Sequence, residues 1–95
     1  MMITRIVKMS FLPEKVESFI HLFEKHRQAI SSVEGCRSLK LLRGNSSSIF
    51  FTVSEWDDEK YLENYRHSEL FNTVWSNTKI FFNAKPEAWT THQVE

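Results

Sequence analysis

The sequence predicts a small α+β domain, an antiparallel β-sheet with helices on one of its faces. Two observations support this fold class. Stretches in which apolar and polar residues alternate, as in strands, are separated by stretches in which apolar residues recur every three or four positions, as in helices. The 95 residues also contain eight phenylalanines but only two glycines and two prolines, a composition that can bury a core. We therefore expect residues 1–95 to form one domain.

The chain is predicted to begin with a strand and a long helix. Residues 2–11 carry apolar side chains on both faces of the predicted strand, with Arg5 among those of one face. Pro13 ends this strand and suits the first turn of a helix. Residues 14–33 then place apolar side chains on one arc at helical spacing, and Gly35 is expected to end the helix. Because the strand is apolar on both faces, we expect both faces of the sheet to be covered.

A β-hairpin is predicted to follow the helix. Residues 36–43 and 48–56 each alternate in the manner of a strand. Between them lies a run of residues that favour turns, Gly44-Asn45-Ser46-Ser47. Two strands joined in this way form the second and third strands of the expected antiparallel sheet.

A split helix and a strand complete the prediction. Asp57 is expected to cap a short helix, and Ser68 a second helix whose apolar stripe runs on to Phe82. Residues 88–94 alternate as a last strand. The order strand, helix, strand, strand, split helix, strand is the ferredoxin-like arrangement, with the helices on one face of an antiparallel sheet.

Charge and cysteine content argue against several classes of function. Basic and acidic residues balance at 12 each, so no clustered positive charge for nucleic acid or an anionic membrane is expected. Cys36 is the only cysteine and cannot form an internal disulfide, and the four histidines are too scattered to propose a metal site. The first ten residues lack the apolar region of a secretory signal, and no apolar run approaches the length of a membrane span. We therefore expect a cytoplasmic protein.

Three groups of residues carry a resemblance to a known family. They are Glu34-Gly35-Cys36 after the first helix, Glu55-Trp56-Asp57-Asp58 at the end of the third strand, and Tyr65, Ser68 and Phe71 spaced by threes. In these residues and in element order, the sequence resembles the antibiotic biosynthesis monooxygenase (ABM) domain family over residues 2–94. The resemblance implies a homodimer in which two sheets pack face to face as an α+β barrel. It also implies a ligand cleft between each sheet and its own helices.

The resemblance does not imply one activity, because the chemistries of the family diverge. Some members oxidise aromatic polyketides or quinols with molecular oxygen and no cofactor, others degrade haem, and others isomerise small signalling molecules. Tyr65 and Leu70 stand where many members have histidines. Val7 and Trp75 stand where the haem-degrading members have an asparagine and the histidine that ligates haem. Neither side chain can ligate iron, so we do not expect haem to be a substrate.

The first hypothesis is an enzyme, a cofactor-independent monooxygenase acting on a small aromatic or quinol-type substrate. His67 is the candidate for proton transfer because an unperturbed histidine titrates near neutral pH. Arg5, on an apolar strand face, is the candidate for stabilising a substrate anion. The aromatic residues expected to line the cleft are Trp56, Tyr65, Phe71 and Trp75. Each has a structural alternative, since these aromatic residues could equally form the core and His67 could be solvated.

The second hypothesis is a non-catalytic module. A small dimer could bind a small-molecule ligand without reacting with it, or have only a structural role. The replacement of the usual histidines by Tyr65 and Leu70 favours this alternative. The retained aromatic residues are compatible with both hypotheses.

Overall fold

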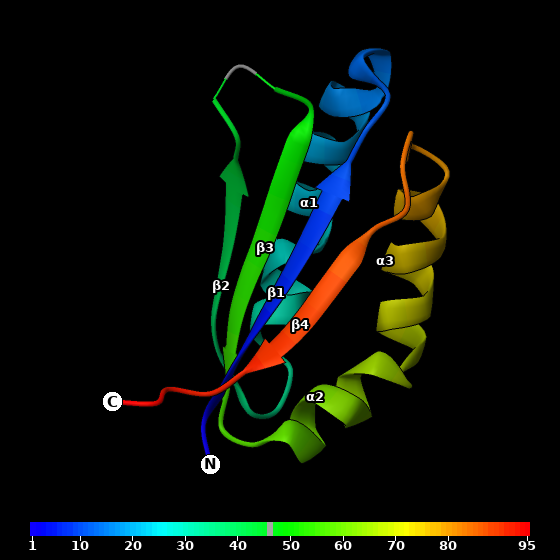
Figure 1. The fold of residues 1–95 in the computed structure, drawn as a ribbon. Helices are drawn as coiled ribbons and strands as arrows, with labels where there is room; N and C mark the ends of the chain where they lie inside the picture. Colours follow the sequence, from blue (N-terminus) through cyan, green and yellow to red (C-terminus); the bar gives the residue numbers. More distant parts are fainter. Residues whose placement is uncertain (46) are drawn as a thin grey trace.

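The computed structural model describes residues 1–45 and 47–95, which form a four-stranded antiparallel sheet with helices on one face (Figure 1). In sequence, the elements are β1 (Ile3–Ser10), a short 3-10 helix η1 (Pro13–Lys15), α1 (Val16–Ser31), β2 (Cys36–Arg43), β3 (Ile49–Trp56), α2 (Glu59–Arg66), α3 (Glu69–Lys79) and β4 (Glu87–Thr91). The strands lie in the order β2-β3-β1-β4, so β1 and β3 are central. This arrangement confirms the predicted ferredoxin-like fold class.

The strand register sorts the side chains onto two faces of the sheet. Residues directly opposite each other in an antiparallel pair point to the same side. Arg5 lies opposite Ser54 on β3 and Thr90 on β4, on the side that the helices cover. Ile6 lies opposite Val53 and Trp89, on the side that the helices leave open. We call this second side the open face.

The core between the sheet and α1 is built largely of phenylalanines. Phe11 is fully buried, and its ring stacks on that of Phe19 with 4.1 Å between centroids. Phe50 meets both rings edge-on from the middle of the sheet. A second buried cluster, of Ile3, Trp56 and Leu62, lies where α2 meets the ends of β1 and β3. Much of the aromatic content of the chain is therefore buried in the core.

The caps of the two short helices differ in how well the sequence predicted them. Ser68 caps α3 as predicted, accepting a hydrogen bond from the backbone N–H of Phe71 at 3.1 Å. The prediction that Asp57 caps α2 is wrong, because the cap is Asp58, which accepts from the N–H of Lys60 at 3.1 Å. Asp57 instead pairs with the guanidinium of Arg37 on β2. Which of the two adjacent aspartates caps α2 therefore depends on contacts with other elements.

Several predicted boundaries also shift. The long helix is interrupted near its start, because η1 precedes α1 and the α-helix begins only at Val16. α3 ends at Lys79, so Phe82 lies beyond it and forms an isolated bridge to Phe11. β4 covers Glu87–Thr91 and not 88–94, and its pairing with β1 ends at Thr4 opposite Thr91. In the predicted turn of the hairpin, Ser46 lies outside the described residues.

Figure 1 shows α1 behind the sheet, α2 at the lower end of the sheet and α3 rising beside β4. In the part of the chain that the structure describes, none of these helices is both long and apolar enough to span a membrane.

Candidate functional site

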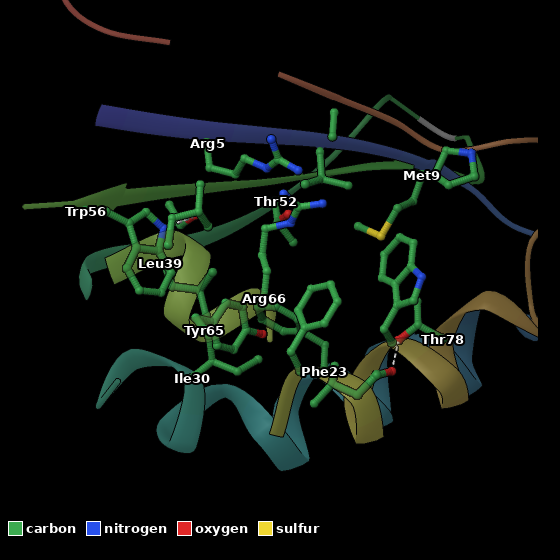
Figure 2. A pocket seen from close by; sticks show the side chains of 18 of the residues that line it. Arg5, Met9, Phe23, Ile30, Leu39, Thr52, Trp56, Tyr65, Arg66 and Thr78 are labelled. Carbon is green, nitrogen blue, oxygen red and sulfur yellow. Dashed lines mark hydrogen bonds between the residues drawn. The ribbon is translucent and has the colours of Figure 1, made fainter. Parts of the chain in front are cut away.

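A cavity of about 340 Å³ lies between the helix-covered side of the sheet and the helices (Figure 2). It separates the phenylalanine core near α1 from the cluster around Trp56, since residues of both clusters line it. Most of its walls are apolar. The sheet contributes Arg5, Val7, Met9, Leu39, Thr52, Ser54, Trp56, Glu87 and Ala88, and Pro86 precedes β4. The helices contribute Phe19, Phe23, Ile30, Leu62, Tyr65, Arg66, Phe71, Val74, Trp75 and Thr78.

One end of the cavity is closed by a fixed pair of rings. Trp56, at the end of β3, is only 1 % exposed, and its indole N–H donates to the hydroxyl of Ser54 at 2.9 Å. The ring of Tyr65 stacks on it from α2, with 5.4 Å between centroids and 26° between planes. Such offset stacking adds to the stabilisation that burial provides. The two rings therefore form a rigid wall.

The phenol of Tyr65 is held in its neutral form. Burial, with a smaller contribution from Cys36, raises the pKa of Tyr65 to about 12. At neutral pH the hydroxyl is therefore protonated and can donate a hydrogen bond. Since Tyr65 lines the cavity, this donor can serve a ligand there.

A second aromatic wall follows α3. Phe71 and Trp75 are one helical turn apart, and their rings stack with 5.9 Å between centroids and 11° between planes. Tyr65 meets Phe71 edge-on at 5.3 Å, so this wall is continuous with the first. The four aromatic residues expected at the cleft thus line one cavity, and none of them is left outside it.

Two arginines bring positive charge to these walls. Arg5 is half-buried, and its Nη1 donates to the hydroxyl of Thr90 at 2.8 Å. Arg66, in the last turn of α2, donates from Nη1 to Oε1 of Glu63 at 2.9 Å. Burial and then repulsion from Arg66 lower the pKa of the Arg5 guanidinium, against the opposing effect of Glu63 and Glu59. Arg5 was expected at the site. Arg66 was missed, because no pattern in a short polar helix distinguishes it.

The structure does not bring His67 to this cavity. His67 follows α2 as its C-terminal cap, and its side chain is 81 % exposed. Its Nε2 lies 3.6 Å from Oε2 of Glu63, on the surface. The residue expected to move protons is therefore apart from the arginine and the four aromatic residues expected to act with it.

The cavity is poor in groups that could bind a metal or remove a proton. Of the described residues that line it, none is a histidine and the one acidic residue is Glu87. The carboxylate of Glu87 lies 3.7 Å from Nζ of Lys8, whose position in β1 faces the open side of the sheet. Nor do three His, Cys, Asp or Glu side chains gather as a metal site anywhere in residues 1–45 and 47–95. The site is suited to binding a flat apolar molecule and to stabilising negative charge on it.

Comparison with solved structures shows where this fold occurs. A conserved protein from Methanosarcina mazei Go1 has a TM-score of 0.91 at 22 % identity, with 97 % of this chain and 92 % of that chain covered. An antibiotic biosynthesis monooxygenase has a TM-score of 0.91 at 15 % identity, with 98 % and 99 % covered. Rv0793 from Mycobacterium tuberculosis has the same TM-score at 12 % identity, with 100 % and 97 % covered. At these identities the likeness establishes the fold alone.

Sequence comparison establishes the family. None of the curated proteins matches the chain significantly. The model of the family described as Antibiotic biosynthesis monooxygenase, however, matches residues 2–74. The matched range includes β1, α1, the hairpin, α2 and the first half of α3, and so most of the cavity walls. The chain belongs to the antibiotic biosynthesis monooxygenase (ABM) family.

Proposed function

We propose that the protein is a cofactor-independent monooxygenase that acts on a small aromatic or quinol-type substrate in the cavity between sheet and helices. The observation that carries this proposal is the gathering of Trp56, Tyr65, Phe71 and Trp75 on its walls. Flat rings favour stacked or edge-on contact with such side chains. The volume of about 340 Å³ is at the lower end of the range of roughly 300–1,000 Å³ for ligand pockets, which favours a small substrate.

The chemistry proposed here uses the electrons of the substrate itself. An anthrone is a suitable example, because it ionises to an electron-rich anion that molecular oxygen can oxidise. Its ring CH2 group and O2 give a ring carbonyl and water, so two C–H bonds break and one oxygen atom enters the product. The protein must bind the ring and favour its anion. Oxygen is the only co-reactant.

Two residues have roles in this proposal. Arg5 stabilises the negative charge that develops on the substrate oxygen, since a fixed cation in a partly buried site interacts more strongly than in water. Tyr65, with its pKa raised to about 12 by burial, donates a hydrogen bond to the same oxygen. Because His67 lies outside the cavity, the substrate proton leaves to water. The proposed substrate must therefore be acidic enough to ionise near neutral pH when it is bound beside Arg5.

The alternative is a domain that binds such a ligand without oxidising it. One observation favours it, the absence of a histidine among the described residues that line the cavity. Native mass spectrometry of the purified protein identifies any ligand carried through purification. Oxygen uptake with anthrones and quinols then separates the two functions. Uptake above the rate in buffer supports the monooxygenase, whereas ligand binding without uptake supports the alternative.

We also propose a homodimer formed through the open face. This face has a row of apolar side chains on the central strands, with Ile6 opposite Val53 and with Phe51 on the same side. At its margins, Leu42 is 49 % exposed and Trp89 is 45 % exposed. An apolar patch of this kind is more typical of an interface than of a solvated surface. A second copy of the chain would cover it by the same residues.

A further inference from the structure

Two guanidinium groups reach into the cavity from opposite walls. Figure 2 shows Arg5 extending from the sheet and Arg66 from the helical side, into the space between them. They belong to β1 and α2, elements joined in the fold by the buried cluster of Ile3, Trp56 and Leu62. The remaining walls are largely apolar. The positive charge of the cavity is therefore concentrated in one part of it.

The protein itself uses only a fraction of the hydrogen-bonding capacity of the two groups. A guanidinium has five N–H donors in a planar fork. The side-chain bonds are one from Arg5 to the hydroxyl of Thr90 and one from Arg66 to the carboxylate of Glu63. The side chain of Glu63 is itself 43 % exposed, so its carboxylate can also accept hydrogen bonds from water. Donors on both arginines are left for a ligand.

Like charges facing each other in a partly buried space repel, and the pKa of Arg5 is lowered first by burial and then by Arg66. An anion between the two groups would replace this repulsion with two attractive contacts. A carboxylate has the geometry for it, because its two oxygens accept the parallel N–H donors of a guanidinium. The side chain of Arg66 is 41 % exposed, so such an anion would lie toward solvent with its apolar part deeper in the cavity.

We infer that the cavity binds a small aromatic carboxylate, with its carboxylate held between Arg5 and Arg66 and its ring against the aromatic walls. This inference narrows the substrate class of the proposed function and rests on it for the aromatic ligand. Arg66 becomes a binding residue. Arg5 contacts the carboxylate, and its remaining donors stabilise the charge that develops on the substrate oxygen. Ligands that lack the anionic group should still enter the cavity, but they should bind more weakly than an aromatic carboxylate whose ring fits equally well.

The test uses two probes of nearly equal shape, 2-naphthoate and its neutral amide, 2-naphthamide. Isothermal titration calorimetry at pH 7 measures the binding of each to the wild type and to Arg5→Gln and Arg66→Gln. The control is Arg37→Gln, which removes the same charge from a side chain that is 63 % exposed and does not line the cavity. We expect 2-naphthoate to bind wild type about ten- to a hundredfold more tightly than the amide, as for hydrogen bonds to charged groups.

Each cavity variant should lose about tenfold or more in affinity for 2-naphthoate, while its affinity for the amide changes less than about threefold. Arg37→Gln should bind both probes as the wild type does. If Arg5→Gln does not fold, Arg66→Gln decides alone, since it changes a partly exposed side chain. Equal binding of the two probes, unaffected by either variant, would overturn the carboxylate site between Arg5 and Arg66. It would leave the aromatic cavity of the proposed function intact. Binding of neither probe would count against both.

Discussion

Gly35→Ala should destabilise the protein strongly, because Gly35 is where the chain turns beneath α2. Its φ is +85°, in the left-handed region that residues with a side chain rarely adopt. A Cβ placed there would lie 2.3 Å from Cγ of Tyr61, which is inside van der Waals contact. The carbonyl of Gly35 also accepts a hydrogen bond from the N–H of Asp57 at 2.8 Å, which limits how far the turn can move.

Two costs add in this variant. The left-handed conformation costs a residue with a Cβ about 1–2 kcal/mol. Forcing the Tyr61 ring away adds about 1–3 kcal/mol, as for other overpacked sites. In a domain of this size each kcal/mol lowers the melting temperature by about 4–8 °C, so we expect a decrease of at least about 10 °C. Because Tyr61 belongs to the helix that carries Tyr65 and Arg66, ligand binding should weaken as well.

The second glycine of the chain provides the control. A Cβ at Gly44 would first meet the hydroxyl of Ser47 at 2.7 Å, the end of a small side chain that can rotate away by giving up its hydrogen bonds with Gly44 and Ile49. Gly44 has no positive φ. Gly44→Ala should change the free energy of unfolding by less than about 1 kcal/mol. Thermal melting followed by circular dichroism compares the two variants. If Gly35→Ala melts within two or three degrees of Gly44→Ala, the conformational and steric reasoning is wrong.

Four further results are expected. Trp56→Ala should lower the free energy of unfolding by about 3–5 kcal/mol, because its ring is 1 % exposed; a loss below about 1 kcal/mol in urea unfolding would mean that the ring is not in the core. The pKa of Tyr65 is about 12 in the folded protein and about 10 in an unfolded chain, so its contribution to stability is complete below pH 10 and is lost as the pH rises to 12. Urea midpoints should therefore fall less steeply over this range in Tyr65→Phe than in the wild type, and equal slopes would contradict the raised pKa. Haemin should give neither a stoichiometric Soret shift nor bleaching with ascorbate, since Val7 and Trp75 cannot ligate iron; turnover to a bilin would refute this expectation. Sedimentation at low micromolar concentration should give twice the mass of one chain, and a single species of 11.3 kDa would refute the homodimer.

Local sequence patterns were sufficient for the faces of the strands. In β1 the alternation that placed Arg5 with Val7 and Met9 is a property of the backbone, so it holds in the folded sheet. The cap at Ser68 was equally predictable, since a serine before an acidic first turn satisfies the free N–H groups locally. Of the four aromatic residues of the cleft, Tyr65, Phe71 and Trp75 were predictable from helical spacing combined with the family resemblance. Trp56, at the end of β3, was predictable from the resemblance alone.

What the sequence could not predict depends on contacts between distant elements. Asp57 and Asp58 are equally suited to cap α2, and contacts with distant residues distinguish them: Arg37 on β2 pairs with Asp57, and the N-terminal amine of Met1 with Asp58. Arg66 and His67 are adjacent at the end of α2, yet only Arg66 lines the cavity, since successive helical residues point about 100° apart around the axis. Helical phase at that end is set by packing of α2 on the sheet, which no local pattern encodes.

The place of Trp75 shows a third limit. Its spacing from Phe71 correctly predicted that it faces inward, and the two rings are stacked. Whether it forms the core or lines the cleft was left open by the sequence, and in the structure it is only partly buried and lines the cavity. Periodicity identifies which side of a helix faces inward. It does not indicate how much space remains between that side and the sheet.

Oxidation of an anthrone under ¹⁸O2 tests the central claim most directly, because a monooxygenase must place one atom of molecular oxygen in its product. Dithranol is incubated with the wild type, with Arg5→Gln and with the control Arg37→Gln, and the anthraquinone formed above the rate in buffer is analysed by mass spectrometry. The account predicts one ¹⁸O atom in each anthraquinone molecule formed, with a catalysed rate that Arg5→Gln lowers and Arg37→Gln leaves unchanged. An anthraquinone formed no faster than in buffer, or one without ¹⁸O, would contradict it.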